Sequence, residues 1–119
     1  MERIYFIDHR GIQILQLDFS NCPKATLLQS VKDARREVTR HPIGSLRTLT
    51  NFSGTSFDDE VVKAFKELAQ HNRPYVKASA VVGVTGMKHI ILQAIEKFSS
   101  RTFNVCDTVE QAKDWLATH

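Results

Sequence analysis

Three short apolar segments in this chain are each followed by a stretch with the spacing of an amphipathic helix. The pairs are Leu46–Phe52 with Phe57–His71, Val76–Val84 with Gly86–Phe98, and Phe103–Cys106 with Thr108–Thr118. Alternation between a two-residue and a 3.6-residue hydrophobic period is typical of β-α units, which place parallel strands in one sheet. The pattern therefore predicts an α/β domain.

The first residues predict a β-hairpin. Arg3–Asp8 and Ile12–Phe19 are strand-like, and Gly11 supplies a turn residue that accepts a positive φ. Because Ile14 and Leu15 are adjacent apolar residues, the second strand is expected to be buried on both faces or to contain a bulge.

A further helix is expected between Pro23, which suits a first helical turn, and Pro42, which forces the preceding residue out of the α region. The complete order is ββαβαβαβα. An antiparallel first strand followed by right-handed crossovers predicts a mostly parallel mixed sheet of five strands with four helices, in one domain over residues 1–119.

Helical spacing also predicts which side chains of the last two helices are buried. In Gly86–Phe98 the expected core stripe consists of Met87, Ile90, Ile91, Ala94, Ile95 and Phe98. The last helix begins with a capping box at Thr108, and we expect Trp115 to pack against the sheet.

Composition favours an ordinary globular protein, with 42% hydrophobic and 24% charged residues. No apolar run reaches the roughly 18 residues of a membrane span, and the first residues lack the apolar core of a signal peptide. A cytoplasmic protein is therefore expected. Cys22 and Cys106 match no metal or redox spacing, and the five histidines form no ligand pair, so no metal or cofactor is expected.

Positive charge is concentrated in Lys24–His41, whose net charge of +3 equals that of the whole chain. The basic residues there are Lys24, Lys32, Arg35, Arg36 and Arg40. Such a segment is either a solvated helix face or a patch for an acidic partner. The small net charge and the lack of a recognised motif argue against specific nucleic-acid binding.

Four strings of the sequence resemble the SpoIIAA-like fold of anti-anti-sigma factors and STAS domains, and more narrowly the small bacterial STAS/SEC14 domain proteins. The strings are Ile14–Ser20, Leu49–Thr55, Lys77–Gly86 and Thr108–Leu116. The resemblance spans nearly the whole chain. It implies a SpoIIAA-like fold and a regulatory, non-enzymatic role in binding other proteins.

The resemblance also directs attention to the loop after the third predicted strand. In anti-anti-sigma factors the regulatory serine lies there, in an Asp-Ser-Ser-Gly type motif. This chain lacks that motif but carries hydroxyls and carboxylates at Ser53, Thr55, Ser56, Asp58 and Asp59. These residues either cap the following helix, through Ser56 or Asp58, or form a partner-docking or phosphorylated loop.

A second candidate is the turn after the fourth strand, where Thr85, Gly86 and Lys88 lie. Backbone N–H groups at such a turn can hold an anion or a ligand carboxylate, although the spacing is not that of a Walker A loop. The alternative is that its glycines serve close packing alone.

We thus expect a protein partner to dock on Ser53–Asp59 and the adjoining helix face. The alternative is a module for a small anionic or lipid-like ligand near Thr85 and Gly86. An enzyme is the weakest hypothesis, because no convergent nucleophile, base or metal set is visible. The sequence leaves a homodimer open.

Overall fold

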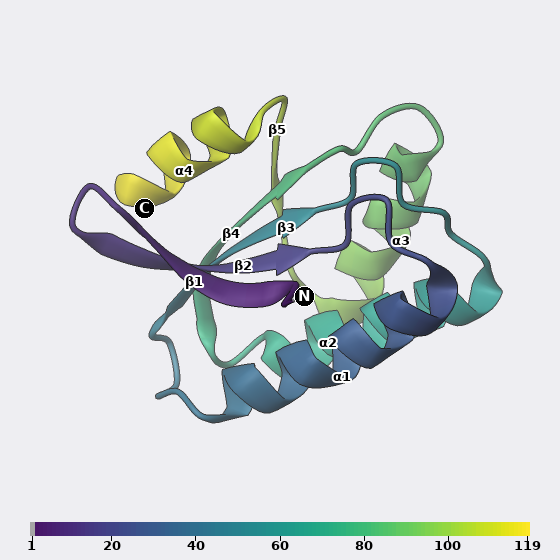
Figure 1. Ribbon diagram of the computed structural model, residues 1–119, viewed down its shortest axis with the longest axis horizontal. Helices are drawn as coiled ribbons and strands as arrows, with labels where there is room; N and C mark the ends of the chain where they lie inside the picture. The colour runs from purple at the N-terminus through teal and green to yellow at the C-terminus, as the bar shows by residue number, and fades with distance from the viewer. Residues whose placement is uncertain (1) are drawn as a thin grey trace.

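The computed structural model describes residues 2–119 and contains a mixed five-stranded sheet with four helices (Figure 1). The strands are β1 (Ile4–His9), β2 (Ile12–Asp18), β3 (Leu46–Asn51), β4 (Val76–Val82) and β5 (Asn104–Cys106). The helices are α1 (Lys24–Thr39), α2 (Asp59–Asn72), α3 (Lys88–Ser99) and α4 (Val109–Ala117). The predicted α/β class and the element order ββαβαβαβα are confirmed.

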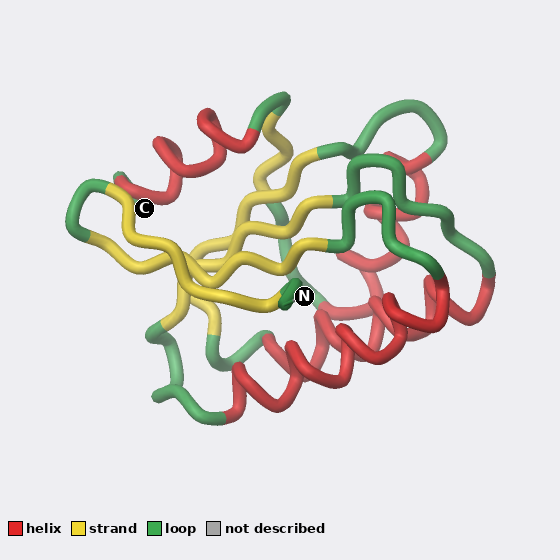
Figure 2. The backbone as a smooth tube through the Cα atoms, viewed as in Figure 1, coloured by secondary structure: helices red, strands yellow, loops and turns green. Residues whose placement is uncertain are grey.

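The strands lie side by side in sequence order, β1-β2-β3-β4-β5. β1 pairs antiparallel with β2, and every other pair is parallel. Because each right-handed crossover advances to the next strand in the same direction, α1, α2 and α3 are all placed on one face. The final helix, α4, covers the opposite face (Figures 1 and 2).

The larger core lies between the sheet and α1–α3. Its centre is a group of phenylalanines, in which Phe65 meets Phe19 at 4.8 Å and Phe52 at 5.1 Å between ring centroids, both edge to face. Phe57 joins the same group from the loop before α2, 5.5 Å from Phe52. These aromatic rings fix the start of α2 against the ends of β2 and β3.

A second core lies under α4. It consists of Ile14, Leu49, Ala80, Val82, Ala112 and Leu116, with Trp115 packed at its margin. Ile14 belongs to this cluster while its neighbour Leu15 belongs to the larger one, and both are fully buried. β2 pairs with β1 in unbroken register from Ile12 to Leu17, so β2 is buried on both faces and has no bulge there.

Helix α3 departs from the predicted core stripe. Met87 is 77% exposed, Ile90 63% and Phe98 47%, whereas the buried residues are Leu92, Ile95 and Ser99. Of the predicted set only Ile95 is buried, with Ile91 and Ala94 half-buried. The reason is that α3 carries apolar residues on more than one side, and Ser99 is able to face inward because its hydroxyl donates to the Ile95 carbonyl at 2.7 Å. Periodicity alone did not identify the buried side.

Helix α4 agrees with its prediction. The Thr108 hydroxyl accepts a hydrogen bond from the Gln111 N–H at 3.1 Å, and the Gln111 side chain accepts one from the Asp107 N–H at 3.1 Å. Trp115 is half-buried against the sheet, and its ring stacks on His119 with centroids 4.1 Å apart. None of the helices within residues 2–119 has the length and apolarity needed to cross a membrane.

Candidate functional site

The loops that follow β2, β3 and β4 meet at the carboxyl edge of the parallel strands (Figure 2). The Asn21 N–H donates to the Ser53 carbonyl at 2.9 Å, and the Phe52 N–H donates to the Val82 carbonyl at 2.9 Å. The backbone therefore continues to pair beyond the ends of the strands. This pairing places the loop with Ser53–Asp59 between its two neighbours.

Two glycines allow this close approach. Gly54 has φ +67°, and a Cβ there would lie 2.1 Å from the Asn21 side-chain oxygen. Gly83 has φ +79°, and a Cβ there would lie 2.3 Å from the Ser53 nitrogen. A Cβ at Gly83 would push the loops apart because it meets backbone atoms, whereas one at Gly54 would displace the Asn21 side chain.

The three predicted hydroxyls have different surroundings. Ser53 and Ser56 are exposed, while Thr55 is only 4% exposed and its hydroxyl donates to the Phe19 carbonyl at 2.8 Å. Thr55 therefore holds the loop on the end of β2. Ser53 and Ser56 are the hydroxyls that another molecule is able to reach.

The two predicted carboxylates, Asp58 and Asp59, also have different surroundings. The Asp58 carboxylate, and not the Ser56 hydroxyl, caps α2 by accepting from the Val61 N–H at 2.8 Å. Asp58 and Glu60 both pair with the Lys24 ammonium, at 2.7 and 2.8 Å. The hydrogen bond from Lys24, and then that from Val61, lowers the pKa of the Asp58 carboxyl. Asp59 is exposed and has no ion pair within residues 2–119.

The turn after β4 leaves Thr85 and Gly86 exposed but engages Lys88. The Lys88 ammonium donates to the Phe52 carbonyl at 2.9 Å and to the Gly83 carbonyl at 3.5 Å, so it links two loops. The first backbone N–H groups of α3 are also hydrogen-bonded. The Lys88 N–H donates to the Thr85 carbonyl at 3.1 Å, and the His89 N–H donates to the Gly86 carbonyl at 3.2 Å. An anion here would have to compete with these internal bonds.

The exposed apolar side chains of α3 adjoin this turn. Met87 directly follows Gly86, and Ile90 lies one helical turn further on. Sequence reasoning missed their exposure because it assigned both to the core. α3 carries more apolar residues than one buried side requires, and this excess is the sequence signal that could have predicted their exposure.

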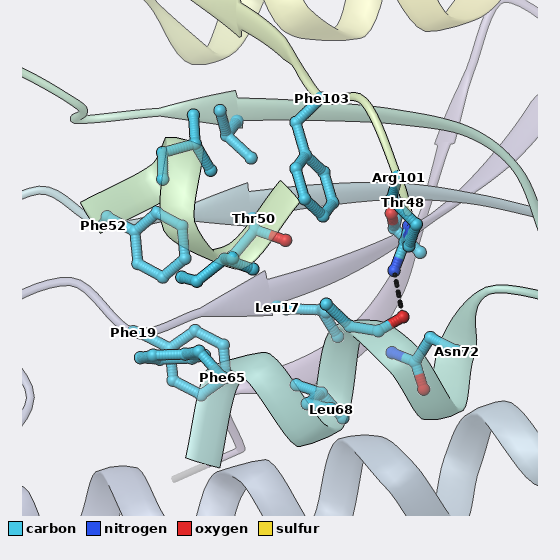
Figure 3. Close-up of a pocket in the computed structure, with 14 residues that line it drawn as sticks. Leu17, Phe19, Thr48, Thr50, Phe52, Phe65, Leu68, Asn72, Arg101 and Phe103 are labelled. Carbon is cyan, nitrogen blue, oxygen red and sulfur yellow. Dashed lines mark hydrogen bonds between the residues drawn. The ribbon is translucent and has the colours of Figure 1, made fainter. Parts of the chain in front are cut away.

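Between the sheet and helices α2 and α3 lies a cavity of about 40 Å³ (Figure 3). Most of its lining is apolar, contributed by Leu17, Phe19, Phe52, Phe65, Leu68, Ala69, Val81, Leu92, Ile95 and Phe103. Its polar lining residues are Thr48, Thr50, Asn72 and Arg101. No sequence pattern predicted this cavity.

Arg101 is the most unusual polar residue of the cavity. Its guanidinium donates to the Ala69 carbonyl at 3.1 Å and to the Ser79 hydroxyl at 2.6 Å, and it stacks 4.6 Å from the Phe103 ring. Within residues 2–119 no carboxylate lies within ion-pair distance of Arg101. Burial lowers the pKa of Arg101 to about 10, because it penalises the charged form.

The basic segment lies on the outer side of α1. Arg36 pairs with Asp33 at 3.8 Å, and Arg40 pairs with Glu37 at 3.5 Å. Both contacts are exposed ion pairs within one helix, the pattern of a solvated helix face.

Residues 2–119 contain no group of three side chains suited to hold a metal ion. Cys22 and Cys106 are free thiols, and burial raises the pKa of each, which lowers the fraction of reactive thiolate. Comparison of the chain with protein-family models, curated proteins and solved structures found no match.

Proposed function

We propose that this chain is a non-enzymatic protein-interaction domain of the SpoIIAA-like, STAS kind, acting in the bacterial cytoplasm. Its docking surface comprises Ser53, Ser56, Asp59, Met87 and Ile90. The observation that carries the proposal is the exposure of two large apolar side chains, Met87 and Ile90, at the start of α3, where Lys88 bonds to the Phe52 carbonyl at the root of the hydroxyl-bearing loop. Exposed apolar groups rimmed by polar ones are typical of protein interaction sites.

The rigidity of the loops supports the same proposal. Thr55, Gly83 and Lys88 each hold the Ser53–Asp59 loop against a neighbouring segment. A preorganised surface loses little conformational entropy when a partner binds. The chemistry of the surface calls for a partner with an apolar patch that covers Met87 and uncharged hydrogen-bonding groups that meet Ser53 and Ser56.

The test uses a matched pair of exposed apolar residues. Met87 and Ile43 are both 77% exposed, but Ile43 lies in the loop before β3, at the opposite edge of the sheet. A photo-reactive amino acid at position 53 identifies the partner by cross-linking, and the affinity of the purified partner is then measured. Met87→Ser is expected to weaken binding at least tenfold, and Ile43→Ser to leave it unchanged.

Charge at the loop gives an independent arm of the test. Ser53→Asp and Ser56→Asp place a carboxylate on the exposed loop, where little stability is lost, and both should weaken partner binding. If these folded variants and Met87→Ser all bind the partner as the wild type does, the docking surface is wrong. If the cross-linked partner is a second copy of the chain, sedimentation will show a dimer that Met87→Ser dissociates.

A second candidate function is the binding of a small anionic or lipid-like molecule. At Thr85 and Gly86 such a ligand meets donors that are already engaged by the turn. The cavity beside Arg101 has a volume of about 40 Å³, which is space for one or two water molecules and too little for a lipid-like one.

A further inference from the structure

The two edges of the sheet differ in how they are protected from another chain. β5, at one edge, is three residues long, whereas β1, at the other edge, has six (Figure 1). Natural edge strands are usually guarded by short length, proline, lysine or a bulge. β1 has the sequence IYFIDH and pairs with β2 in unbroken register, so it has none of these features. Its only carboxylate, Asp8, lies near its end.

Every second residue of β1 directs its backbone N–H and C=O groups away from β2. The Asp18 N–H donates to the Arg3 carbonyl at 2.8 Å, so Arg3 faces β2. Hydrogen-bonded and non-hydrogen-bonded positions alternate along an antiparallel pair. The backbone groups of Ile4, Phe6 and Asp8 therefore point outward, where no other segment of residues 2–119 pairs with them.

The side chains of the same three residues face α1. Ile4 and Phe6 pack against the larger core, and Asp8 shares their face because side chains alternate along a strand. Asp8 is exposed, and no basic group within residues 2–119 lies at ion-pair distance from its carboxylate. The free edge thus carries an unpaired carboxylate on the α1 side.

A hollow between β1 and α1 offers groups that suit this carboxylate. Its lining consists of Glu2, Arg3, Ile4, Ser30, Asp33, Arg36, Glu37 and Arg40. Arg36 pairs with Asp33 at 3.8 Å, and Arg40 pairs with Glu37 at 3.5 Å. Exposed pairs within one helix contribute little. The two guanidinium groups are therefore available to a further carboxylate.

We propose that this chain forms a two-fold symmetric dimer in which β1 pairs antiparallel with β1 of a second copy, with the axis at Phe6. Such an axis sets Phe6 opposite its own counterpart and Ile4 opposite Asp8 of the second copy. All the outward N–H and C=O groups of these three residues then pair, and the two sheets become one. Asp8 of the second copy also reaches the hollow beside Ile4, where Arg36 and Arg40 lie.

Moving the axis by one residue is unfavourable in either direction. One residue toward the N-terminus, Asp8 would face Glu2 of the second copy, and directly opposed like charges are destabilising. One residue toward the C-terminus, Ile4 would face Arg10, which lies in the hairpin turn with φ +51° and does not extend the ladder. The register centred on Phe6 is the one that brings opposite charges together.

Amide hydrogen exchange of the full chain, followed by NMR at increasing protein concentration, tests the pairing residue by residue. In a monomer the outward N–H groups of Ile4, Phe6 and Asp8 exchange freely, whereas those of Tyr5 and Ile7 are protected by β2. In the dimer all five are protected. We expect exchange at Phe6 to slow at least tenfold as concentration rises, and sedimentation equilibrium to show a dimer over the same range.

Charge-reversal variants test the contact between Asp8 and the hollow. Asp8→Lys brings an ammonium beside Arg36 of the second copy and should raise the dimer Kd at least tenfold, and Arg36→Glu should do the same. The combined variant Asp8→Lys with Arg36→Glu restores the attraction and should dimerise as the wild type does. Asp107→Lys reverses an exposed carboxylate after β5, at the opposite edge, and is the control that leaves the dimer unchanged.

The proposal fails if the chain sediments as a monomer at every concentration, or if it dimerises while Phe6 still exchanges as a free edge does. It also fails if the combined variant dimerises no better than either single variant. These results do not bear on the docking surface, because Met87 precedes α3, which connects β4 and β5 on the far side of the sheet from β1. Met87→Ser should leave the β1 dimer intact.

Discussion

Helices α3 and α4 each follow a parallel strand, yet their apolar side chains are placed differently. α4 turns one stripe inward, where Ala112 and Leu116 are fully buried, and its first turn is capped by Thr108. α3 has no side-chain cap at its start and leaves Met87 and Ile90 in solvent. α4 therefore buries its apolar stripe against the sheet, whereas α3 keeps apolar side chains in solvent, and these belong to the proposed docking surface.

The strongest test of this contrast is Leu116→Ala in α4. Leu116 is fully buried and α4 is the helix that covers its face of the sheet, so truncation should lower the free energy of unfolding by about 3 kcal/mol. Urea denaturation measures the change. A loss below about 1 kcal/mol would mean that α4 is loosely held and that the contrast with α3 is wrong.

Trp115→Ala should have the next largest effect. A fully buried tryptophan costs about 3–5 kcal/mol when truncated, but Trp115 is half-buried and stacks on the C-terminal His119, so we expect about 2 kcal/mol. The same denaturation experiment applies. His119→Ala measures the part of this loss that comes from the stacked pair. A loss above about 4 kcal/mol for Trp115→Ala would place the ring wholly in the core.

The cap of α4 gives a smaller effect. Thr108→Ala removes the hydroxyl that accepts from the Gln111 N–H and should cost about 1 kcal/mol. Thr102→Ala, at an exposed position before β5, is the control and should remain within about 0.5 kcal/mol of the wild type. Equal effects of the two substitutions would show that the cap does not contribute to α4.

The smallest change is expected on α3, at Ile90. Ile90→Ser should alter stability by less than about 0.5 kcal/mol, because the side chain is already in solvent. Ile95→Ala, on the buried side of the same helix, should cost about 3 kcal/mol. A large loss of stability in Ile90→Ser would mean that Ile90 is part of the core, as the sequence predicts, and that it does not belong to the docking surface.

The fold was predictable because its signals are local. The change of period at each β-α unit, the turn at Gly11 and the capping box at Thr108 all act within a few residues. The pair Ile14 and Leu15 left two alternatives, and only the pairing with β1 decided between them. Similarly, Ser56 and Asp58 were both suitable caps, and the position of Lys24, the first residue of α1, favours Asp58.

The cavity could not be predicted from the sequence because the residues that line it are far apart along the chain. Arg101 meets Ala69 from α2 and Ser79 from β4, which lie 32 and 22 residues away. No spacing rule connects such positions. The exposed side of α3 was missed for a different reason, since a helix with apolar residues on several sides fits a buried stripe in more than one rotation.

The simple strand order of the sheet has a consequence for where any ligand binds. Open α/β sheets usually bind small molecules at a topological switch point, where the strand order reverses and adjacent crossovers leave toward opposite faces. The parallel strands here run β2-β3-β4-β5 without reversal, and the three crossover helices stay on one face. The loops at the carboxyl edge lie against one another, as the contacts of Ser53 with Asn21 and Gly83 show. Because the sheet has no switch point, the exposed residues on the outer surface of these loops are the groups that another molecule could meet at this edge.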